Sequence, residues 1–187
     1  MKSLYTPYAI TVSDFASGPP ASPSSGDIWV ATNADSLADG IRWQFQYNAG
    51  SSSAYKWEFI GGPPVQVFSP TGNGWASGGN YNDVGAYYTT IRSGDWSIFT
   101  HLSSDNTTGV ATHFYFGVAD NSTTTVNRVL DEVYSPLSGT LFNLTGRDRL
   151  NNVTAGHVIY TNGATSAGSG SAAVSYAQMA LTPIRVA

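Results

Sequence analysis

The most regular hydrophobic pattern in the chain lies between Ile41 and Gly62, in the stretch IRWQFQYNAGSSSAYKWEFIGG. Every second residue from Ile41 to Tyr47 is apolar and the residues between are polar, which is typical of a half-buried β-strand. The alternation returns from Tyr55 to Phe59 after a loop of small residues, so the two runs predict a β-hairpin. Six aromatic side chains would then share one face of this hairpin.

We predict that Asn48 pairs with Ala54 in this hairpin, because that register aligns the aromatic side chains. The expected pairs are Tyr47 with Tyr55, Phe45 with Trp57 and Trp43 with Phe59, and Arg42 lies diagonal to Glu58. A hairpin alone is only marginally stable in water, so the aromatic face must pack on something. We expect Trp43 and Trp57 in the core, and Tyr47 and Tyr55 in an interface with another chain.

Short apolar runs separated by turn residues predict the remaining strands. They fall at residues 8–13, 28–30, 86–91, 96–102, 110–118, 141–144, 158–160, 174–181 and 183–186. Residues 126–134 are predicted to be an irregular crossover, since Asp131 and Glu132 interrupt any apolar face, and residues 163–173 a loop. The expected fold is all-β, with a small three-stranded antiparallel module followed by a jelly-roll β-sandwich.

Proline and glycine clusters divide the chain into four predicted parts. These are an N-terminal arm and tether (1–24), an aromatic β-meander module (25–62), a Pro/Gly linker (63–74) and the sandwich (75–187). The arm has little core of its own, and a terminus of that kind is usually held by packing on something. We therefore expect an assembly interface at Tyr5, Tyr8 and Ile10, with a neighbouring chain holding the arm.

Charge and composition exclude several classes of function. Only 11% of the 187 residues are charged, against about a quarter in an average domain. The net charge is −4 and the Lys and Arg residues are scattered, so we expect no nucleic-acid partner. No apolar run approaches the ~20 residues that span a bilayer, and the first residues lack a secretory signal. Because cysteine is absent, the chain can form neither disulfides nor thiolate metal sites. Together these features predict a soluble protein that folds in a cytoplasm.

Candidate catalytic residues are few. The three histidines, His101, His113 and His157, have no second histidine or carboxylate at metal-ligand spacing. A predicted hairpin would bring His101 near His113, but a structural role is the stronger interpretation. Several aspartates fall at turns, where local hydrogen bonding favours them. No nucleophile elbow, phosphate-binding loop or calcium loop occurs, so we expect no enzyme activity, no metal and no cofactor.

Tyr81, Tyr87 and Tyr88 are candidate saccharide-binding residues, because exposed aromatic rings between amide side chains can stack on sugars. The alternatives, core packing and subunit contact, stay open for these three tyrosines. Four N-x-[ST] sites, at Asn106, Asn121, Asn143 and Asn152, fit chance occurrence in a β surface rich in Thr and Asn.

The N-terminal motifs resemble a known module. The order PPASPSSGDIWV, GIRWQFQYN and SAYKWEFIGGPP, over about residues 18–65, is similar to a small module of virion proteins of tailed bacteriophages, particularly those that infect actinobacteria. In that module a P-x-x-G-D turn precedes W-x-x-x-Y and Y-K-W-E-x-x-G-G-P strands. A β-sandwich similar to the C1q/TNF jelly roll commonly follows it.

Three stretches of this chain resemble that sandwich: SGDWSIFTHLS, NNVTAGHVIY and YAQMALTPIRV. His157 departs from the pattern, in which an Asp is usual. The resemblance implies a non-enzymatic virion component, a minor tail or tail-fibre protein that forms a homotrimer and contacts other tail or capsid proteins. It would be assembled in the host cytoplasm, with its N-terminal part on the particle and its sandwich projecting. Alternatives are a capsid decoration protein or head fibre, and an adhesin that binds host cell-surface glycan.

Overall fold

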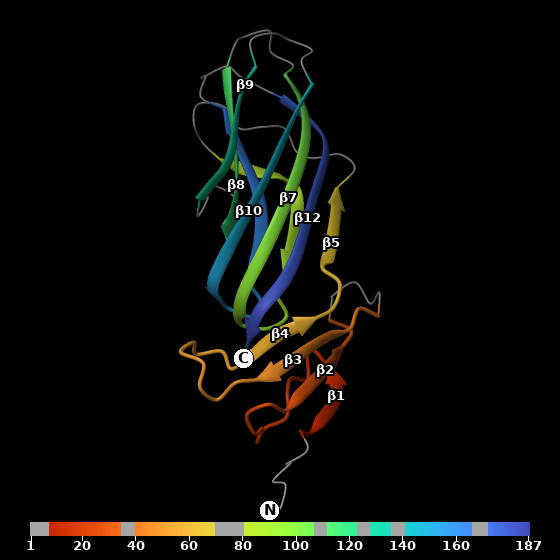
Figure 1. The fold of residues 1–187 in the computed structure, drawn as a ribbon. Helices are drawn as coiled ribbons and strands as arrows, with labels where there is room; N and C mark the ends of the chain where they lie inside the picture. The colour runs from red at the N-terminus through yellow and green to blue at the C-terminus, as the bar shows by residue number, and fades with distance from the viewer. Residues whose placement is uncertain are drawn as a thin grey trace, which may run out of the picture.

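A computed structural model describes residues 8–34, 40–69, 81–106, 112–122, 128–135, 141–165 and 172–187 of the chain. Regular structure in these residues consists of twelve β-strands, so the prediction of an all-β fold is confirmed. A long sandwich of two sheets stands on a smaller sheet formed by the N-terminal strands (Figure 1). The described residues contain no helix capable of spanning a membrane.

The four N-terminal strands, which we call the N-terminal sheet, form one end of an eight-stranded sheet of order β1-β2-β3-β4-β12-β7-β10, in which β4 pairs with β12. Their bounds are Ile10–Asp14 for β1, Ile28–Thr32 for β2, Trp43–Tyr47 for β3 and Trp57–Gly61 for β4. The strands β2, β3 and β4 pair antiparallel as predicted, and β1 adds a parallel strand beside β2. The expectation of an independent arm over residues 1–24 is therefore corrected, since β1 pairs within its own chain.

Eight further strands form the sandwich. They are β5 (Val65–Ser69), β6 (Asn82–Thr89), β7 (Gly94–Asn106), β8 (Thr112–Asp120), β9 (Arg128–Ser135), β10 (Leu141–Val153), β11 (Val158–Thr165) and β12 (Ala172–Val186). One sheet has the order β5-β12-β7-β10 and the other β6-β11-β8-β9. The chain crosses repeatedly between the two sheets, so the sandwich is a jelly roll.

The sandwich core follows from alternation along the strands. Trp96, Ile98 and Leu102 of β7 are fully buried, as their spacing predicts. The alternate residues of β8, Phe114 and Phe116, are buried from the opposite sheet. Inward side chains of both sheets thus fill the space between the layers, as in other aligned sandwiches.

Two sequence predictions in the sandwich are wrong. Residues 126–134 were expected to be irregular, but β9 pairs antiparallel with β8 through a register shift between Phe116 and Gly117. The extra residue of this bulge is Leu130, and Asp131 and Glu132, which interrupt the apolar pattern, pair with Phe116 and Tyr115. The pattern predicts that residues 146–156 separate two short strands, yet β10 continues as far as Val153 beside β7. Gly146 allows this path, because a Cβ there would lie 2.5 Å from the Leu130 side chain of β9.

The linker predicted at residues 63–74 also needs correction. Its residues 65–69 form β5, which pairs with β12 from Ala177 to Leu181 and is part of the sandwich. The strand β4 pairs with β12 only at Arg185 and Val186. Pro183 lies between these two pairing segments, where its missing N–H costs no hydrogen bond on that side.

The hairpin of β3 and β4 has a different register from the predicted one. Tyr47 pairs with Trp57 and Phe45 with Phe59, a shift of two residues that leaves every side chain on its predicted face. Tyr55 lies in the loop instead of the ladder, because Ser51 and Ser53 accept hydrogen bonds from loop N–H groups. Glu58 lies near Arg185, at 3.6 Å, rather than near Arg42.

The aromatic face of the hairpin is covered by this chain itself. Phe15 follows β1 and lies over the sheet, with its ring 5.1 Å from Trp43 and 5.7 Å from Trp29. On the sandwich side, the ring of Trp96 lies 5.9 Å from Trp43. Trp43 is fully buried and Trp57 is 4% exposed. These rings thus form an intramolecular core, as predicted for Trp43 and Trp57, and the contact with another chain at Tyr47 and Tyr55 stays a prediction.

Charged residues strengthen the junction between the two parts. The Asp95 carboxylate, 6% exposed, accepts a hydrogen bond from the Arg149 guanidinium at 3.2 Å and lies 3.9 Å from Arg185. Asp95 also accepts the main-chain N–H of Asn152. Arg92 lies over the Trp29 ring, and its Nε–H donates to the Ala187 carbonyl. The Arg92–Trp29 contact, the Arg185–Glu58 ion pair and the pairing of β4 with β12 join the module to the sandwich, whereas the Asp95 contacts lie within the sandwich.

Replacement of Trp43 tests this shared core. Trp43→Ala should lower the free energy of unfolding by about 3–5 kcal/mol, because it leaves a cavity bordered by both parts of the molecule. Guanidinium denaturation measures the loss. As a control, Ile60→Ala at a half-exposed position of β4 should change stability by less than about 0.5 kcal/mol. A loss below about 1 kcal/mol for Trp43→Ala would contradict a shared core.

Candidate interaction surfaces

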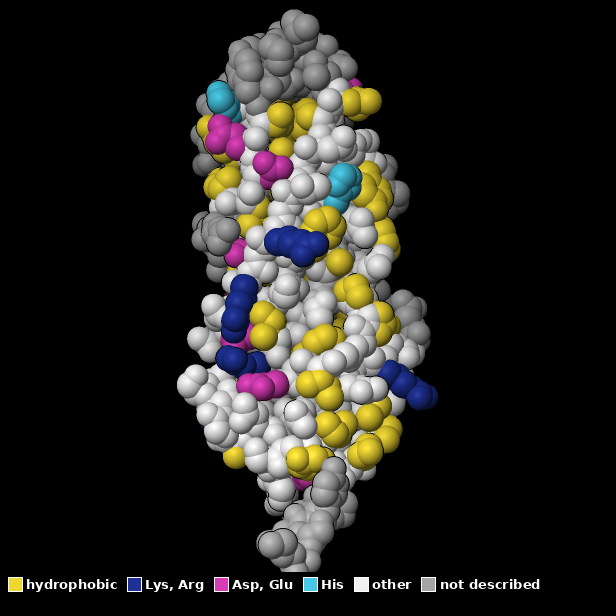
Figure 2. Space-filling view, in the orientation of Figure 1, with side chains coloured by type: hydrophobic (Ala, Val, Ile, Leu, Met, Phe, Trp, Pro, Cys, Tyr) yellow, Lys and Arg dark blue, Asp and Glu magenta, His cyan; other side chains and the backbone are white. Residues whose placement is uncertain are grey.

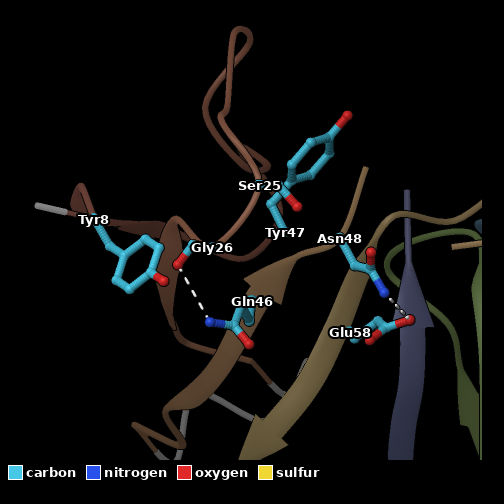
Figure 3. Close-up of a pocket in the computed structure, with 7 residues that line it drawn as sticks. All are labelled: Tyr8, Ser25, Gly26, Gln46, Tyr47, Asn48 and Glu58. Carbon is cyan, nitrogen blue, oxygen red and sulfur yellow. Dashed lines mark hydrogen bonds between the residues drawn. The ribbon is translucent and has the colours of Figure 1, made fainter. Parts of the chain in front are cut away.

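A polar hollow lies at the hairpin end of the N-terminal sheet. It has a volume of about 260 Å³ and is lined by Tyr8, Ser25, Gly26, Gln46, Tyr47, Asn48 and Glu58. Figure 3 shows Tyr8 beside Gly26 and Gln46, and Asn48 facing Glu58 of the neighbouring strand β4. The Gln46 side-chain N–H donates to the Gly26 carbonyl at 3.3 Å, and that of Asn48 donates to Glu58 at 3.2 Å. These bonds fix the amide groups that form the walls.

Gly26 places Tyr8 in this hollow. Its φ of +100° is a conformation that other residues adopt with strain, and a Cβ there would lie 2.1 Å from the Tyr8 ring. The turn at Ser25-Gly26-Asp27, which the sequence predicts, therefore has a second role. It leaves space for the aromatic ring that precedes β1.

Asp27 ties the start of β1 to the turn before β2. Its carboxylate accepts hydrogen bonds from the main-chain N–H groups of Ser24 at 2.8 Å and Ala9 at 2.9 Å. These two bonds, with Ser24 the larger cause, lower the pKa of the Asp27 carboxyl below its usual 3.8. The group is therefore ionised at neutral pH.

An aliphatic block occupies the outer face of β1 and β2. Ile10 and Val12 are 70% and 64% exposed, and their Cα partners across the parallel pair are Ile28 and Val30. Figure 2 shows a group of hydrophobic side chains over these two strands. Contiguous exposed apolar side chains of this kind mark interaction surfaces.

The outer face of the β5-β12-β7-β10 sheet carries aromatic side chains with few charges. Phe68 is 53% exposed, and its ring lies 6.3 Å from that of Tyr176, which in turn is 5.8 Å from His101. Further along β7, the Arg147 guanidinium lies over Phe99. We call Phe68, Tyr176, His101 and Phe99 the sandwich aromatic row. The outward side chains of β5, β12 between Tyr176 and Thr182, and β7 between Ser97 and Ser103 include no Asp, Glu, Lys or Arg.

The predicted saccharide-binding tyrosines separate in the structure. Tyr88 is 2% exposed and packs against Trp96, so it is a core residue and its predicted role is wrong. Tyr87 is 56% exposed, and its ring lies 6.1 Å from that of Tyr160 on β11. Tyr81 is partly buried, and this burial raises the pKa of its hydroxyl. Alternation alone shows that Tyr87 and Tyr88 face opposite ways, but not which of them faces inward.

The predicted assembly residues also differ from one another. Tyr8 and Tyr47 both line the hollow, and Ile10 belongs to the aliphatic block. Tyr55 lies apart from them in the hairpin loop, and Tyr5 falls outside the described residues. The sequence reasoning missed Val12, Phe68 and Tyr176. Val12 continues the alternation that begins at Ile10, so the sequence could have revealed it. Phe68 and Tyr176 lie side by side only because β5 pairs with β12, which the sequence does not show.

The histidines are not brought together. His101 lies on the outer face of one sheet, whereas His113 is on the other sheet with its Nδ1 2.6 Å from Glu132. His157 contacts Asp120 at 3.0 Å. Each pair joins neighbouring segments of the β6-β11-β8-β9 sheet. Within the described part of the chain, no group of three or more His, Asp or Glu side chains could hold a metal ion.

The hydrogen bonds of Asp27 predict a pH-dependent effect. Asp27→Asn should lower the free energy of unfolding at pH 7, because the two N–H groups bond different carboxylate oxygens and asparagine replaces one of these with an NH2 group, which cannot accept. The pKa of Asp27 is 3.8 in the unfolded chain and lower in the folded chain. The difference in unfolding free energy between wild type and Asp27→Asn should therefore be constant above about pH 5, and it should shrink as the pH falls below 3.8 toward the folded-state pKa. Urea denaturation from pH 7 to pH 3 measures the difference from wild type.

Asp83→Asn is the matched control, because burial raises the pKa of the Asp83 carboxyl. Because the folded state binds the Asp83 proton more readily than the unfolded state, Asp83 stabilises the wild-type fold more at low pH. The stability difference between wild type and Asp83→Asn should therefore grow in favour of wild type as the pH falls, whereas that for Asp27→Asn should shrink. Parallel trends for the two variants would contradict this account of Asp27.

Comparison with known proteins yields only distant structural similarities. Neither a protein-family model nor a curated protein matches the chain. The structure of an Eiger TNF from S. frugiperda is 8% identical over 67% of this chain and 94% of that chain, with a TM-score of 0.38. Infectious bursal disease virus, Gx strain, is 12% identical over 79% and 42%, with a TM-score of 0.42. A family 35 carbohydrate-binding module from Clostridium thermocellum is 16% identical over 62% and 96%, with a TM-score of 0.31. Because these identities and TM-scores are low, the fold is assigned from the strand pairing of this chain and not from the similarities.

Proposed function

We propose that this chain is a non-enzymatic structural component of a tailed-bacteriophage virion, a minor tail or tail-fibre protein that forms a homotrimeric appendage. The resemblance of residues 18–65 to a phage virion module, followed by a jelly-roll sandwich, is the starting point. In this proposal the N-terminal sheet docks on the particle and the sandwich projects from it. A capsid decoration protein or head fibre would use the same two parts.

The observation that carries the proposal is the sandwich aromatic row. An outward sheet face with aromatic side chains and few charged groups, among them Arg147 over the Phe99 ring, resembles an interface core, in which charged residues are depleted. Phe68 is 53% exposed, so burial against a second copy would remove much apolar surface from water. Three copies packed through this sheet would leave the β6-β11-β8-β9 sheet on the outside.

Phe68→Asp tests the subunit contact. The wild-type chain should have three times its 19.8 kDa mass by light scattering after gel filtration. The new carboxylate would be desolvated between subunits, so the variant should dissociate at least about tenfold more readily. Val129→Asp, at a 42% exposed position of β9, is the matched control and should remain a trimer. A monomeric wild-type chain that is absent from purified particles would overturn the proposed function.

A second candidate function is glycan binding at the host surface. Its support is the pair of outward tyrosines, Tyr87 and Tyr160, whose rings lie 6.1 Å apart on neighbouring strands. Amphipathic rings at such positions can stack on a sugar while their hydroxyl groups remain in water. This interpretation keeps Tyr87 from the predicted saccharide site and replaces Tyr88 by Tyr160.

The adhesin function predicts that Tyr87→Ala weakens binding to host cell-wall glycan by at least about tenfold, since aromatic anchors dominate such contacts. Tyr55→Ala, in the hairpin loop of the module, should leave binding unchanged. Binding of labelled full-length protein to isolated cell walls measures both. Absence of binding by the wild-type chain across host strains would remove this candidate.

A further inference from the structure

The outer edge of β1 presents unpaired main-chain groups. β1 is the terminal strand of its sheet and pairs in parallel with β2. The Ile28 N–H donates to the Ala9 carbonyl and the Phe15 N–H donates to the Thr32 carbonyl. In a parallel pair, alternate residues direct both main-chain groups toward one neighbour. The N–H and C=O groups of Ile10 and Val12 therefore point away from β2, and no described strand pairs with them.

The side chains on this edge are apolar and exposed. Ile10 and Val12 are 70% and 64% exposed, and both lie on the face that carries the aliphatic block. Proteins usually protect an edge strand with lysine, proline or a bulge. The strand ITVSD contains neither lysine nor proline, and its pairing with β2 has no register shift. The edge therefore has the form of a site for strand addition.

Fixed negative charges lie at both ends of this edge. Asp27 holds the start of β1 through its hydrogen bond from the Ala9 N–H. Asp14 ends the strand, and its carboxylate accepts hydrogen bonds from the Asn33 side chain at 2.9 Å and from the Ala16 N–H at 2.8 Å. These bonds, with Asn33 the larger cause, lower the pKa of the Asp14 carboxyl. Both carboxylates are ionised at neutral pH.

The surrounding sequence has the same sign of charge. Residues 3–41 contain four aspartates, Asp14, Asp27, Asp35 and Asp39, and no Lys or Arg. Pairing of two copies of β1 would bring the Asp14 and Asp27 carboxylates of both copies together, which like-charge repulsion opposes. A segment with basic residues would instead be attracted to the edge.

We propose that the free edge of β1 binds an extended segment of another protein, with aliphatic side chains at alternate positions and Lys or Arg at each end. The segment adds to the sheet as a further strand. Its main chain pairs with Ile10 and Val12, and its aliphatic side chains extend the aliphatic block. Main-chain pairing supplies affinity, and the alternate side chains and the flanking charges supply specificity. The inference rests on the proposed function, because it gives the chemistry of the particle protein on which the module docks.

Binding of designed peptides to the full-length chain tests the inference. The probe is a fluorescent nine-residue peptide in which valine and threonine alternate and lysine occupies both ends. The comparison peptide has glutamate at both ends. Fluorescence polarisation should show binding at least about tenfold tighter for the lysine peptide, and this preference should fall as salt is added. Amide hydrogen exchange at Ile10 and Val12 should slow when the lysine peptide is present.

A pair of matched variants locates the site. Val12→Lys places a like charge beside the incoming segment and should weaken binding of the lysine peptide by at least about tenfold. Ile60→Lys adds the same charge on β4, away from the edge, and should leave binding nearly unchanged. Both positions are more than half exposed, and thermal unfolding of each variant verifies that the fold is kept.

The inference is overturned if neither peptide binds, if both bind equally, or if Val12→Lys has no effect. Self-association that Val12→Lys abolishes would assign the edge to a second copy and would also overturn it. A wild-type chain that is trimeric and present in particles but ignores the lysine peptide refutes the inference alone. A chain that binds this peptide but is monomeric and absent from particles refutes the proposed virion function alone.

Discussion

Burial of the Trp43 indole is the contact on which the rest of the structure depends. The ring packs edge-on against Phe15 from the N-terminal arm and lies 5.9 Å from Trp96 of the sandwich. Its Nε1–H donates to the Pro63 carbonyl at 2.7 Å, which satisfies a polar group that burial would otherwise leave unpaired. One side chain therefore couples the arm, the hairpin and the sandwich, and the module is a layer of the fold instead of an attachment to it.

This use of the aromatic face determines which surfaces remain for partners. Most aromatic rings of the hairpin are buried, and two of the apolar surfaces that remain among the described residues are the aliphatic side chains of β1 and the sandwich aromatic row. The first surface combines a main-chain edge with flanking carboxylates, and the second is a face of side chains almost without charge. An edge recruits a strand, whereas such a face packs against another sheet, so the two surfaces suit different partners.

Local pattern was sufficient where alternation was strong. It located β2, β3, β4, β7 and β8, and it assigned the correct face to Trp43, Phe45 and Trp57 although the hairpin register moved by two residues. It failed where inward positions are not apolar. Gly146 and Asp148 interrupt the inward side of β10, and Asp131 interrupts β9. The short strand β5 was missed because its Pro and Gly neighbours resemble a linker.

The order of residues predicts an all-β chain, an aromatic hairpin that must be covered, and contact residues at Tyr8 and Ile10. The packed structure shows that Phe15 and Trp96 provide the cover, that Tyr88 is buried while Tyr87 is exposed, and that β1 is an edge strand among the described strands. Alternation reports which residues share a face of one strand. It contains no information on which distant strand pairs with it, because that choice is made by packing and hydrogen bonding between segments far apart in the chain.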